Sequence, residues 1–276
     1  MNQRPQDLVF TLFGEYLLHR PEPVWVGSLI SLLETFGLSE GAVRTVLSRM
    51  ARKGWLEGER QGRHAFYRLT AKGRDLLEEG ENRIHHPPGE AGWDGRWYLL
   101  AYSIPEEQRH LRDRLRVRLA WLGFGSLGNG LWISPHDVDA RVAALARDMD
   151  VAEHLDRFSA RHLGPDDAAE LVRRCWDLEG IDRRYAEFLE RWGPRLDECR
   201  RRAEDGTLDP EDAYRLRFEL IHEFRAFPLE DPYLPPALLP PGWRGGAAGA
   251  LVEALHTLCR RPADDYVDSI LETHRP

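Results

Sequence analysis

The residues best suited to a chemical role lie within positions 38–69, where hydrogen-bond donors recur at helical spacing. Apolar residues follow the i, i+3, i+4, i+7 spacing of one buried helical face at Val43, Val46, Leu47 and Met50. Short polar side chains and arginines occupy the opposite face. Guanidinium and hydroxyl groups presented in this way can hydrogen-bond to the base edges and phosphates of duplex DNA. The candidate DNA contacts on this helix are Gly41, Arg44, Thr45, Ser48, Arg49, Arg52 and Lys53.

A basic hairpin is predicted directly after this helix. Ser39 is placed to cap the helix, and Gly54 can end it in the left-handed conformation. Two strand-like runs, Trp55–Arg60 and His64–Leu69, are joined by Gln61-Gly62-Arg63. A helix followed by such a hairpin is typical of a winged helix-turn-helix. The hairpin adds four candidate DNA contacts, Arg60, Gln61, Arg63 and His64.

The neighbouring segments supply the elements that must position this helix and hairpin. The sequence predicts helices over Asp7–Leu18, Gly27–Phe36 and Ala71–Arg83. A short strand at Val24–Val26 is placed to pair with the hairpin. Residues 1–86 therefore have the complete order of elements of a winged helix-turn-helix DNA-binding domain.

The charge distribution supports this interpretation. Between Leu38 and Arg74, nine basic residues stand against three acidic ones, although the whole chain has a formal net charge of −8. An acidic body would be repelled by DNA except where the basic part docks, which favours one orientation. For the helix alone, an ordinary amphipathic helix with a solvated basic face is the alternative. The order of helix, glycine and basic hairpin favours double-stranded DNA as the partner.

Two further regions follow a Pro- and Gly-rich linker at His85–Gly92. Residues 93–163 read in the order β-α-β-β-α-β of a ferredoxin-like domain. Residues 164–276 read as a mostly helical C-terminal domain, with a proline-rich segment at Pro228–Trp243 and a last helix over Gly245–Arg260. The predicted fold class is therefore α+β. Because one winged unit covers few base pairs, we expect a symmetric homodimer, with the ferredoxin-like domain providing dimerisation.

Composition and cysteine spacing exclude other classes. The 276 residues contain 42% hydrophobic and 30% charged residues, as in ordinary soluble domains. No apolar run in the sequence approaches the roughly 20 residues that span a bilayer, so no membrane partner is expected. The N-terminal MNQRPQDLVF lacks a signal pattern, which indicates a cytoplasmic protein. Cys175, Cys199 and Cys259 form no CxxC pair, so we expect neither a disulfide framework nor a metal site, and no cofactor.

A family resemblance rests on segments from all three regions. They are VFTLFGEYL, VWVGSLISLLETFGLSEGAVRTVLSRMARKGWLEGERQGRHAFYRLTAKG, GFGSLGNGLWISP and LIHEFRAFPLEDPYLPPALLPPGW. Together these segments resemble the PaaX-like repressors of phenylacetic acid degradation, and the proline-rich segment is the most distinctive. The resemblance implies a bacterial, dimeric transcriptional repressor that an aryl-acyl-CoA, such as phenylacetyl-CoA, releases from its operator. It also implies that the central region is similar to the ferredoxin-like fold of CRISPR-associated nucleases.

Such an effector needs an apolar slot and nearby cations. Residues of the helical region close to the proline-rich segment offer both. The candidate effector contacts are Trp192, Tyr214, His222 and Arg225. For the aromatic residues, core packing is the alternative.

Two other functions are weighed against a ligand-controlled repressor. A metal-dependent nuclease, or another nucleic-acid enzyme on the ferredoxin-like domain, needs an acidic metal ligand at the end of its first strand. That strand is expected to end Ser103-Ile104-Pro105, and the sequence contains no GxSxG, HExxH or phosphate-binding loop. No catalytic residue is therefore predicted, and the protein is not expected to be an enzyme. An effector-independent DNA-binding protein is the third possibility, and a deep apolar pocket in the C-terminal half would favour a sensor over it.

Overall fold

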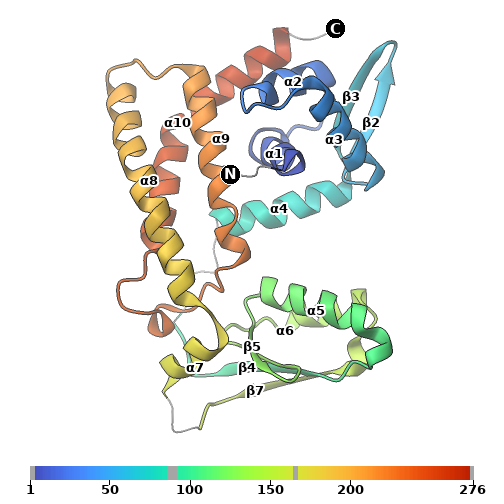
Figure 1. Ribbon diagram of the computed structural model, residues 1–276, viewed down its shortest axis with the longest axis vertical. Coiled ribbons are helices and arrows are strands. Elements are labelled where there is room, and N and C mark those ends of the chain that lie inside the picture. The colour runs from blue at the N-terminus through green and yellow to red at the C-terminus, as the bar shows by residue number, and fades with distance from the viewer. Residues whose placement is uncertain (1–3, 86–91, 164–166, 274–276) are drawn as a thin grey trace. The chain divides into compact units, whose positions relative to one another are not determined.

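A computed structural model describes residues 4–85, 92–163 and 167–273 (Figure 1). Most of the predicted linker at 85–92 lies outside these residues. By its internal contacts the chain divides into two compact units, and each is described by itself. The first unit contains Met1–His86, Phe188–Ala226 and Gly246–Pro276, and the second contains Pro87–Glu187 and Phe227–Gly245.

The N-terminal part of the first unit is a winged helix-turn-helix, as predicted. Its elements are α1 (Pro5–Leu12), continued by a π-helical turn (Phe13–Leu17), β1 (Val24–Trp25), α2 (Val26–Glu34), α3 (Glu40–Arg52), β2 (Leu56–Gln61), β3 (His64–Leu69) and α4 (Ala71–His85). The three strands form an antiparallel sheet in the order β1-β3-β2. Val24 pairs with Tyr67, which confirms that the short strand before α2 extends the hairpin sheet.

Helix α1 is the core element of the winged part. Its residues Leu8, Val9 and Leu12 are fully buried. Figure 1 shows α1 in the middle of this unit, with α2, α3 and α4 around it. Helix α3 is thus held in position by α1, whose apolar residues are buried in the core.

Three C-terminal helices complete the chain's helical part: α8 (Leu178–Glu204), α9 (Pro210–Phe224) and α10 (Gly245–Thr273). The boundary between the two units falls within α8. In the first unit α9 packs against α1, and the Tyr214 hydroxyl donates to the Leu32 carbonyl at 2.9 Å. The prediction that the last helix ends at Arg260 is wrong, because α10 continues through Pro262 and buries Ala263 and Val267.

The second unit contains the predicted β-α-β-β-α-β fold. Its elements are β4 (Trp97–Tyr102), α5 (Arg109–Trp121), β5 (Gly125–Gly128), β6 (Leu131–Ser134), α6 (Asp139–Asp148), β7 (Leu155–Ala160) and α7 (Ala168–Cys175). The sheet is antiparallel in the order β5-β6-β4-β7, and α5 and α6 cover one of its faces (Figure 1). Leu100 of the sheet packs in one core cluster with Leu115 and Leu119 of α5 and Val142 of α6.

The proline-rich segment 228–243 belongs to the second unit. It has no regular strand and only short 3-10 turns, at Phe227–Leu229 and Pro236–Leu238. Within it the carboxylate of Asp231 is buried and accepts hydrogen bonds from the Tyr185 hydroxyl at 2.8 Å and from the backbone N–H of Tyr233 at 2.7 Å. The bond from Tyr185 ties the segment to the start of α8, and the bond from Tyr233 fixes a turn within the segment.

Candidate nucleic-acid interface

Helix α3 is positioned by the residues that the sequence singled out. Ser39 Oγ accepts a hydrogen bond from the backbone N–H of Ala42 at 3.4 Å, which caps the helix. Gly54 has a φ of 72°, so it ends the helix in the left-handed conformation. The four apolar residues of the inner face are all buried, at Val43, Val46, Leu47 and Met50. The opposite face is consequently turned toward solvent.

The basic side chains of that outer face differ in how far they are already engaged. Arg49 and Arg52 are exposed, and neither has an ion-pair partner among the described residues. Arg44, in contrast, binds Glu40 through a 2.8 Å contact from Nε, one helical turn away. Arg49 and Arg52 are therefore the side chains of this helix that are most available to an external anion.

Polar side chains of the same face mostly bind within the protein. The Thr45 hydroxyl donates to the carbonyl of Gly41 at 2.8 Å. Lys53 lies 4.8 Å from the centre of the Trp55 ring, and its ammonium donates to Gln6 at 3.3 Å. Ser48 is exposed. Of the positively charged candidates on α3, Arg49 and Arg52 have the fewest internal contacts.

The wing presents two more arginines. Strands β2 and β3 are joined by a tight turn in which Gly62 has a φ of 62°. Arg60 and Arg63 flank this glycine, are exposed, and have no ion-pair partner within residues 4–85, 92–163 and 167–273. Gln61 donates to Glu59 at 2.9 Å, and the half-buried His64 ring packs edge-on against Trp25 at 5.9 Å. The turn of the wing is thus basic, while the His64 side chain packs against the sheet.

A groove beside α3 adds two residues to the candidate DNA contacts that were not predicted from the sequence. It has a volume of about 650 Å³ and lies between the start of α1 and the outer face of α3. Arg4 and Gln6 line it opposite Thr45, Arg49 and Lys53. Arg4 and Gln6 precede the helix predicted over Asp7–Leu18, so neither was among the predicted DNA contacts. The sequence contained a signal for an earlier helix start, because Pro5, a residue favoured in the first helical turn, directly follows the basic Arg4.

The four candidate effector residues lie in the first unit but do not form one site. Trp192 and His222 line the same pocket, which has a volume of about 270 Å³. Tyr214 is fully buried, and Arg225 binds Asp7 of α1 at 3.4 Å. Neither Tyr214 nor Arg225 lines the pocket. Both instead connect α9 to the winged part.

His222 itself is held neutral. Its Nδ1 lies 2.8 Å from the hydroxyl oxygen of Thr11, which belongs to α1. Burial, together with the positive charge of Arg225, lowers the pKa of His222 to about 4. At neutral pH this imidazole therefore takes part in hydrogen bonding and packing but offers no positive charge to a ligand.

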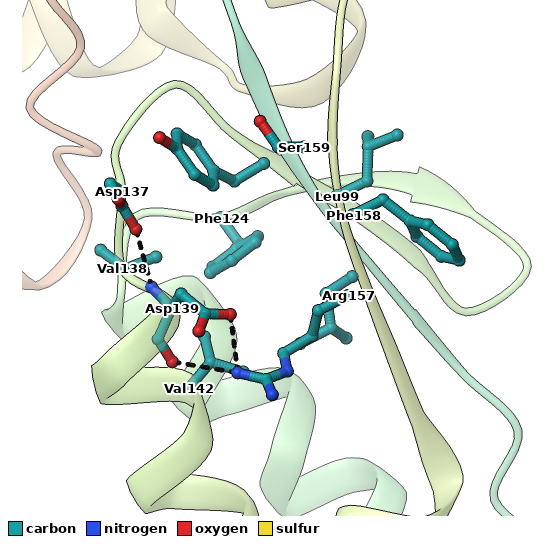
Figure 2. A pocket seen from close by; sticks show the side chains of 11 residues that line it. Leu99, Phe124, Asp137, Val138, Asp139, Val142, Arg157, Phe158 and Ser159 are labelled. Carbon is teal, nitrogen blue, oxygen red and sulfur yellow. Dashed lines mark hydrogen bonds and ion pairs between the residues drawn. The ribbon is translucent and has the colours of Figure 1, made fainter.

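The ferredoxin-like domain contains a smaller pocket that bears on the nuclease alternative. The pocket has a volume of about 200 Å³, and Figure 2 shows Asp137 and Asp139 at its side with Arg157. Arg157 binds the Asp139 carboxylate at 2.6 Å, so this carboxylate is already neutralised. The first strand ends at Tyr102, and Ser103 follows it with its N–H bonded to the His154 carbonyl at 3.0 Å. Over the described residues, no group of three or more His, Cys, Asp or Glu side chains is arranged to hold a metal ion.

The fold and its basic surface are those of the winged helix-turn-helix class of DNA-binding proteins. Three family models match successive parts of the chain: "PaaX-like protein" over residues 4–73, "PaaX protein central Cas2-like domain" over 90–172 and "PaaX-like protein C-terminal domain" over 176–269. The chain belongs to the PaaX-like family.

A named relative agrees with this assignment, and a solved structure has a similar fold. The transcriptional repressor PaaX of Escherichia coli (strain K12) is 36% identical over 248 residues, which cover 89% of this chain and 77% of the relative. A solved structure, the uncharacterized protein Rv0674 from Mycobacterium tuberculosis, superposes with a TM-score of 0.61 at 25% identity and covers 95% of this chain and 97% of its own. The named relative is a repressor, which is not an enzyme. Within the described ranges, every helix is too short or too polar to span a bilayer.

Proposed function

We propose that this protein is a cytoplasmic transcriptional repressor of an operon for degradation of phenylacetic acid or a related aromatic acid, and that it binds duplex operator DNA through α3 and the wing. The observation that carries the proposal is the set of four arginines that are exposed and lack ion-pair partners in the described ranges. They lie on the helix and the hairpin that winged proteins place against DNA, at Arg49, Arg52, Arg60 and Arg63. The similarity to the Escherichia coli repressor supports the regulatory role.

The two elements have different parts in this proposal. Arg49 and Arg52 extend from the outer face of α3, where a guanidinium can make two hydrogen bonds to a guanine in the major groove. Arg60 and Arg63 lie at a turn, where they can neutralise phosphates and release counterions. Arg4, on the opposite side of the groove beside α3, is placed for a further phosphate.

The proposal includes a symmetric homodimer held by the ferredoxin-like domain, residues 93–163. Alternate strand residues face opposite sides of a sheet. Leu100 faces the helices of the core cluster, so Leu99 and its cross-strand partner Phe158 lie on the other side. Figure 2 shows these two side chains next to each other, and Phe158 is 56% exposed. An exposed aromatic residue beside a leucine supports this sheet face as the contact between two copies.

An aryl-acyl-CoA such as phenylacetyl-CoA is the proposed effector. The family resemblance supports it, and the pocket that contains Trp192 and His222 has aromatic and cationic residues of the kind such a ligand needs. An effector-independent repressor is the second candidate, because Tyr214 and Arg225 are engaged within the protein.

The experiment begins with duplexes that the protein itself selects from a random library. Fluorescence anisotropy then compares the selected duplex with an unrelated duplex of equal length. We expect the selected duplex to bind roughly 10³-fold more tightly or better, and phenylacetyl-CoA to weaken that binding by about 5–150-fold. Equal affinity for both duplexes would contradict a repressor. Specific binding that saturating phenylacetyl-CoA leaves unchanged would favour the effector-independent candidate.

A further inference from the structure

A second group of exposed arginines lies outside the winged part, on α5 of the ferredoxin-like domain. Residues 93–163 contain ten arginines and ten acidic residues, so this domain is neutral, although the whole chain has a formal net charge of −8. The charge within the domain is unevenly distributed, because five of the ten arginines lie on the 13 residues of α5. Such a concentration of positive charge on one helix attracts polyanions.

The arginines in the first half of α5 are already paired with acidic residues. Arg109 lies 3.8 Å from Asp113, one helical turn further along. Arg112 binds Glu106 of the preceding 3-10 turn at 2.9 Å. The first half of the helix therefore has little positive charge to offer a partner.

The second half of α5 carries three arginines without such pairs, Arg114, Arg116 and Arg118. All three are exposed, and none has an ion-pair partner in the described part of the chain. The helix dipole favours a cation in the last turn, at Arg118, but it does not account for the other two. Among the helices of the described ranges, α5 alone has three exposed arginines of this kind. In this respect it resembles α3 and the wing, where Arg49, Arg52, Arg60 and Arg63 are likewise exposed and unpaired.

The spacing of the three arginines suits the phosphates of a duplex. Arg114 and Arg118 are four residues apart, so they lie on the same flank of the helix, about 6 Å apart along its axis. Phosphates of one DNA strand follow each other at about 3.4 Å along the duplex axis, so these two guanidinium groups match alternate phosphates.

The other flank of α5 carries Arg116. At about 100° per residue, this side chain extends away from the flank of Arg114 and Arg118. Val117, on the ridge between the two flanks, is 70% exposed, so the ridge is open to a partner. Since an α-helix fits the major groove, arginines on both flanks can face the phosphates on both sides of that groove.

We infer that the outer face of α5 is a second contact surface for duplex DNA, which binds the phosphate backbone independently of sequence through Arg114, Arg116 and Arg118. The inference goes beyond the proposed function, in which α3 and the wing bind the operator. A second surface on the same chain acts at a high effective concentration once the first surface is bound. A contact that is weak by itself can therefore add substantially to the affinity for a long duplex.

The test uses the full chain and a long duplex that carries the selected site at its centre. Fluorescence anisotropy at several salt concentrations compares the wild type with Arg114→Ser/Arg116→Ser/Arg118→Ser. Each neutralised phosphate contributes about 0.9 to the slope of log affinity against log salt, so the triple variant should reduce this slope by about 2–3. Its affinity should fall roughly tenfold or more, by the same factor for selected and unrelated long duplexes.

The matched control is Arg173→Ser/Arg200→Ser/Arg201→Ser. It removes the same amount of charge from exposed arginines that already pair with acidic residues. This control should keep the salt slope of the wild type. Circular dichroism and sedimentation equilibrium check that each variant keeps the fold and the oligomeric state of the wild type.

A conservative variant tests whether charge is what the contact requires. Arg114→Lys/Arg116→Lys/Arg118→Lys should keep a slope close to that of the wild type, because neutralisation of phosphates needs only positive charge. A loss of slope as large as in the serine variant would contradict a phosphate contact. If the triple serine variant does not fold, Arg116→Ser alone should reduce the slope by about 1, and an unchanged slope would contradict the inference.

The outcomes separate the second surface from the proposed function. If the wild type prefers the selected duplex and the triple serine variant keeps the wild-type slope, the surface on α5 is refuted and the repressor stands. An equal loss of slope in the matched control would show a general effect of net charge and would also refute the surface. If the wild type shows no preference, but its slope falls in the triple serine variant alone, the repressor is refuted and the second surface stands.

Discussion

Arg217 of α9 donates to Glu15, which follows α1, with Nε 2.5 Å from the Glu15 carboxylate oxygen and both side chains only 6% exposed. His256 of α10 contacts the same carboxylate at 2.8 Å, and Arg217 also reaches Asp264 at 2.7 Å. Burial by itself raises the pKa of Glu15. The hydrogen bond from His256 and the charge of Arg217 outweigh burial and hold this pKa below its usual value. The cluster connects the π-helical turn after α1 to the C-terminal helices α9 and α10.

Removal of Arg217 should destabilise the protein strongly. Arg217→Ala leaves the buried Glu15 carboxylate without its main partner, and breaking a buried pair in this way costs about 3–5 kcal/mol. Urea unfolding, followed by circular dichroism, measures the loss. Arg215→Ala, which removes an exposed pair on the same helix, should change the free energy of unfolding by less than about 1 kcal/mol. Similar losses in the two variants would contradict a structural role for the buried pair.

The stability of the first unit should fall as the pH decreases from about 6.5 to 4. His222 has a pKa near 4 in the folded protein but about 6.5 when unfolded, so between these values the unfolded chain binds the additional proton. Below the folded pKa this contribution is fully lost. His222→Gln should flatten the dependence, as measured by urea midpoints at pH 7, 5.5 and 4.5. The control His19→Gln changes an exposed histidine and should leave the slope as in the wild type.

The ferredoxin-like sheet should hold two copies together. Phe158→Glu puts a charge on the exposed sheet face beside Leu99, so it should convert the proposed homodimer to a monomer and weaken operator binding. Val117→Glu is the matched control, because Val117 of α5 is 70% exposed and its helix covers the opposite side of the sheet. Sedimentation equilibrium at micromolar concentration measures whether each variant is a dimer or a monomer. A Phe158→Glu protein that stays dimeric would exclude this face.

The wing should act mainly through phosphates. Arg60→Ala and Arg63→Ala should each weaken binding to selected and unrelated duplexes by a similar factor. Each should also reduce the slope of log affinity against log salt by about 1. Anisotropy titrations at several salt concentrations give this slope. A loss confined to the selected duplex would instead show that the wing reads bases.

Local signals in the sequence made the winged helix-turn-helix predictable. The spacing of its apolar residues, Ser39 as a cap and Gly54 as an end all act within one helix, so they determine α3 without knowledge of the remaining chain. The order of elements in the ferredoxin-like domain follows from similarly local patterns. The last helix was predicted too short because proline usually ends a helix, whereas burial of Ala263 and Val267 favours its continuation past Pro262.

Long-range relationships could not be read from local patterns. Glu15 and Arg217 are 202 positions apart, and no spacing rule connects them. The contacts of Tyr214 and Arg225 with the winged part depend on the same tertiary packing. Arg44 is a different case, because its ion pair with Glu40 at 2.8 Å is local, one helical turn away, yet Arg44 was predicted only as a DNA contact. Arg44 is therefore a weaker candidate for DNA contact than Arg49 or Arg52.

The most direct test of the account is the affinity of Arg49→Ala/Arg52→Ala for the selected duplex, measured by fluorescence anisotropy. Each arginine that reaches a base should account for about 1–3 kcal/mol, and the loss should be larger for the selected than for an unrelated duplex. Arg68→Ala, which removes a wing arginine already paired with Glu57 at 2.9 Å, should bind nearly as the wild type does. If the double variant keeps wild-type affinity and has an unchanged circular dichroism spectrum, α3 is not the recognition helix.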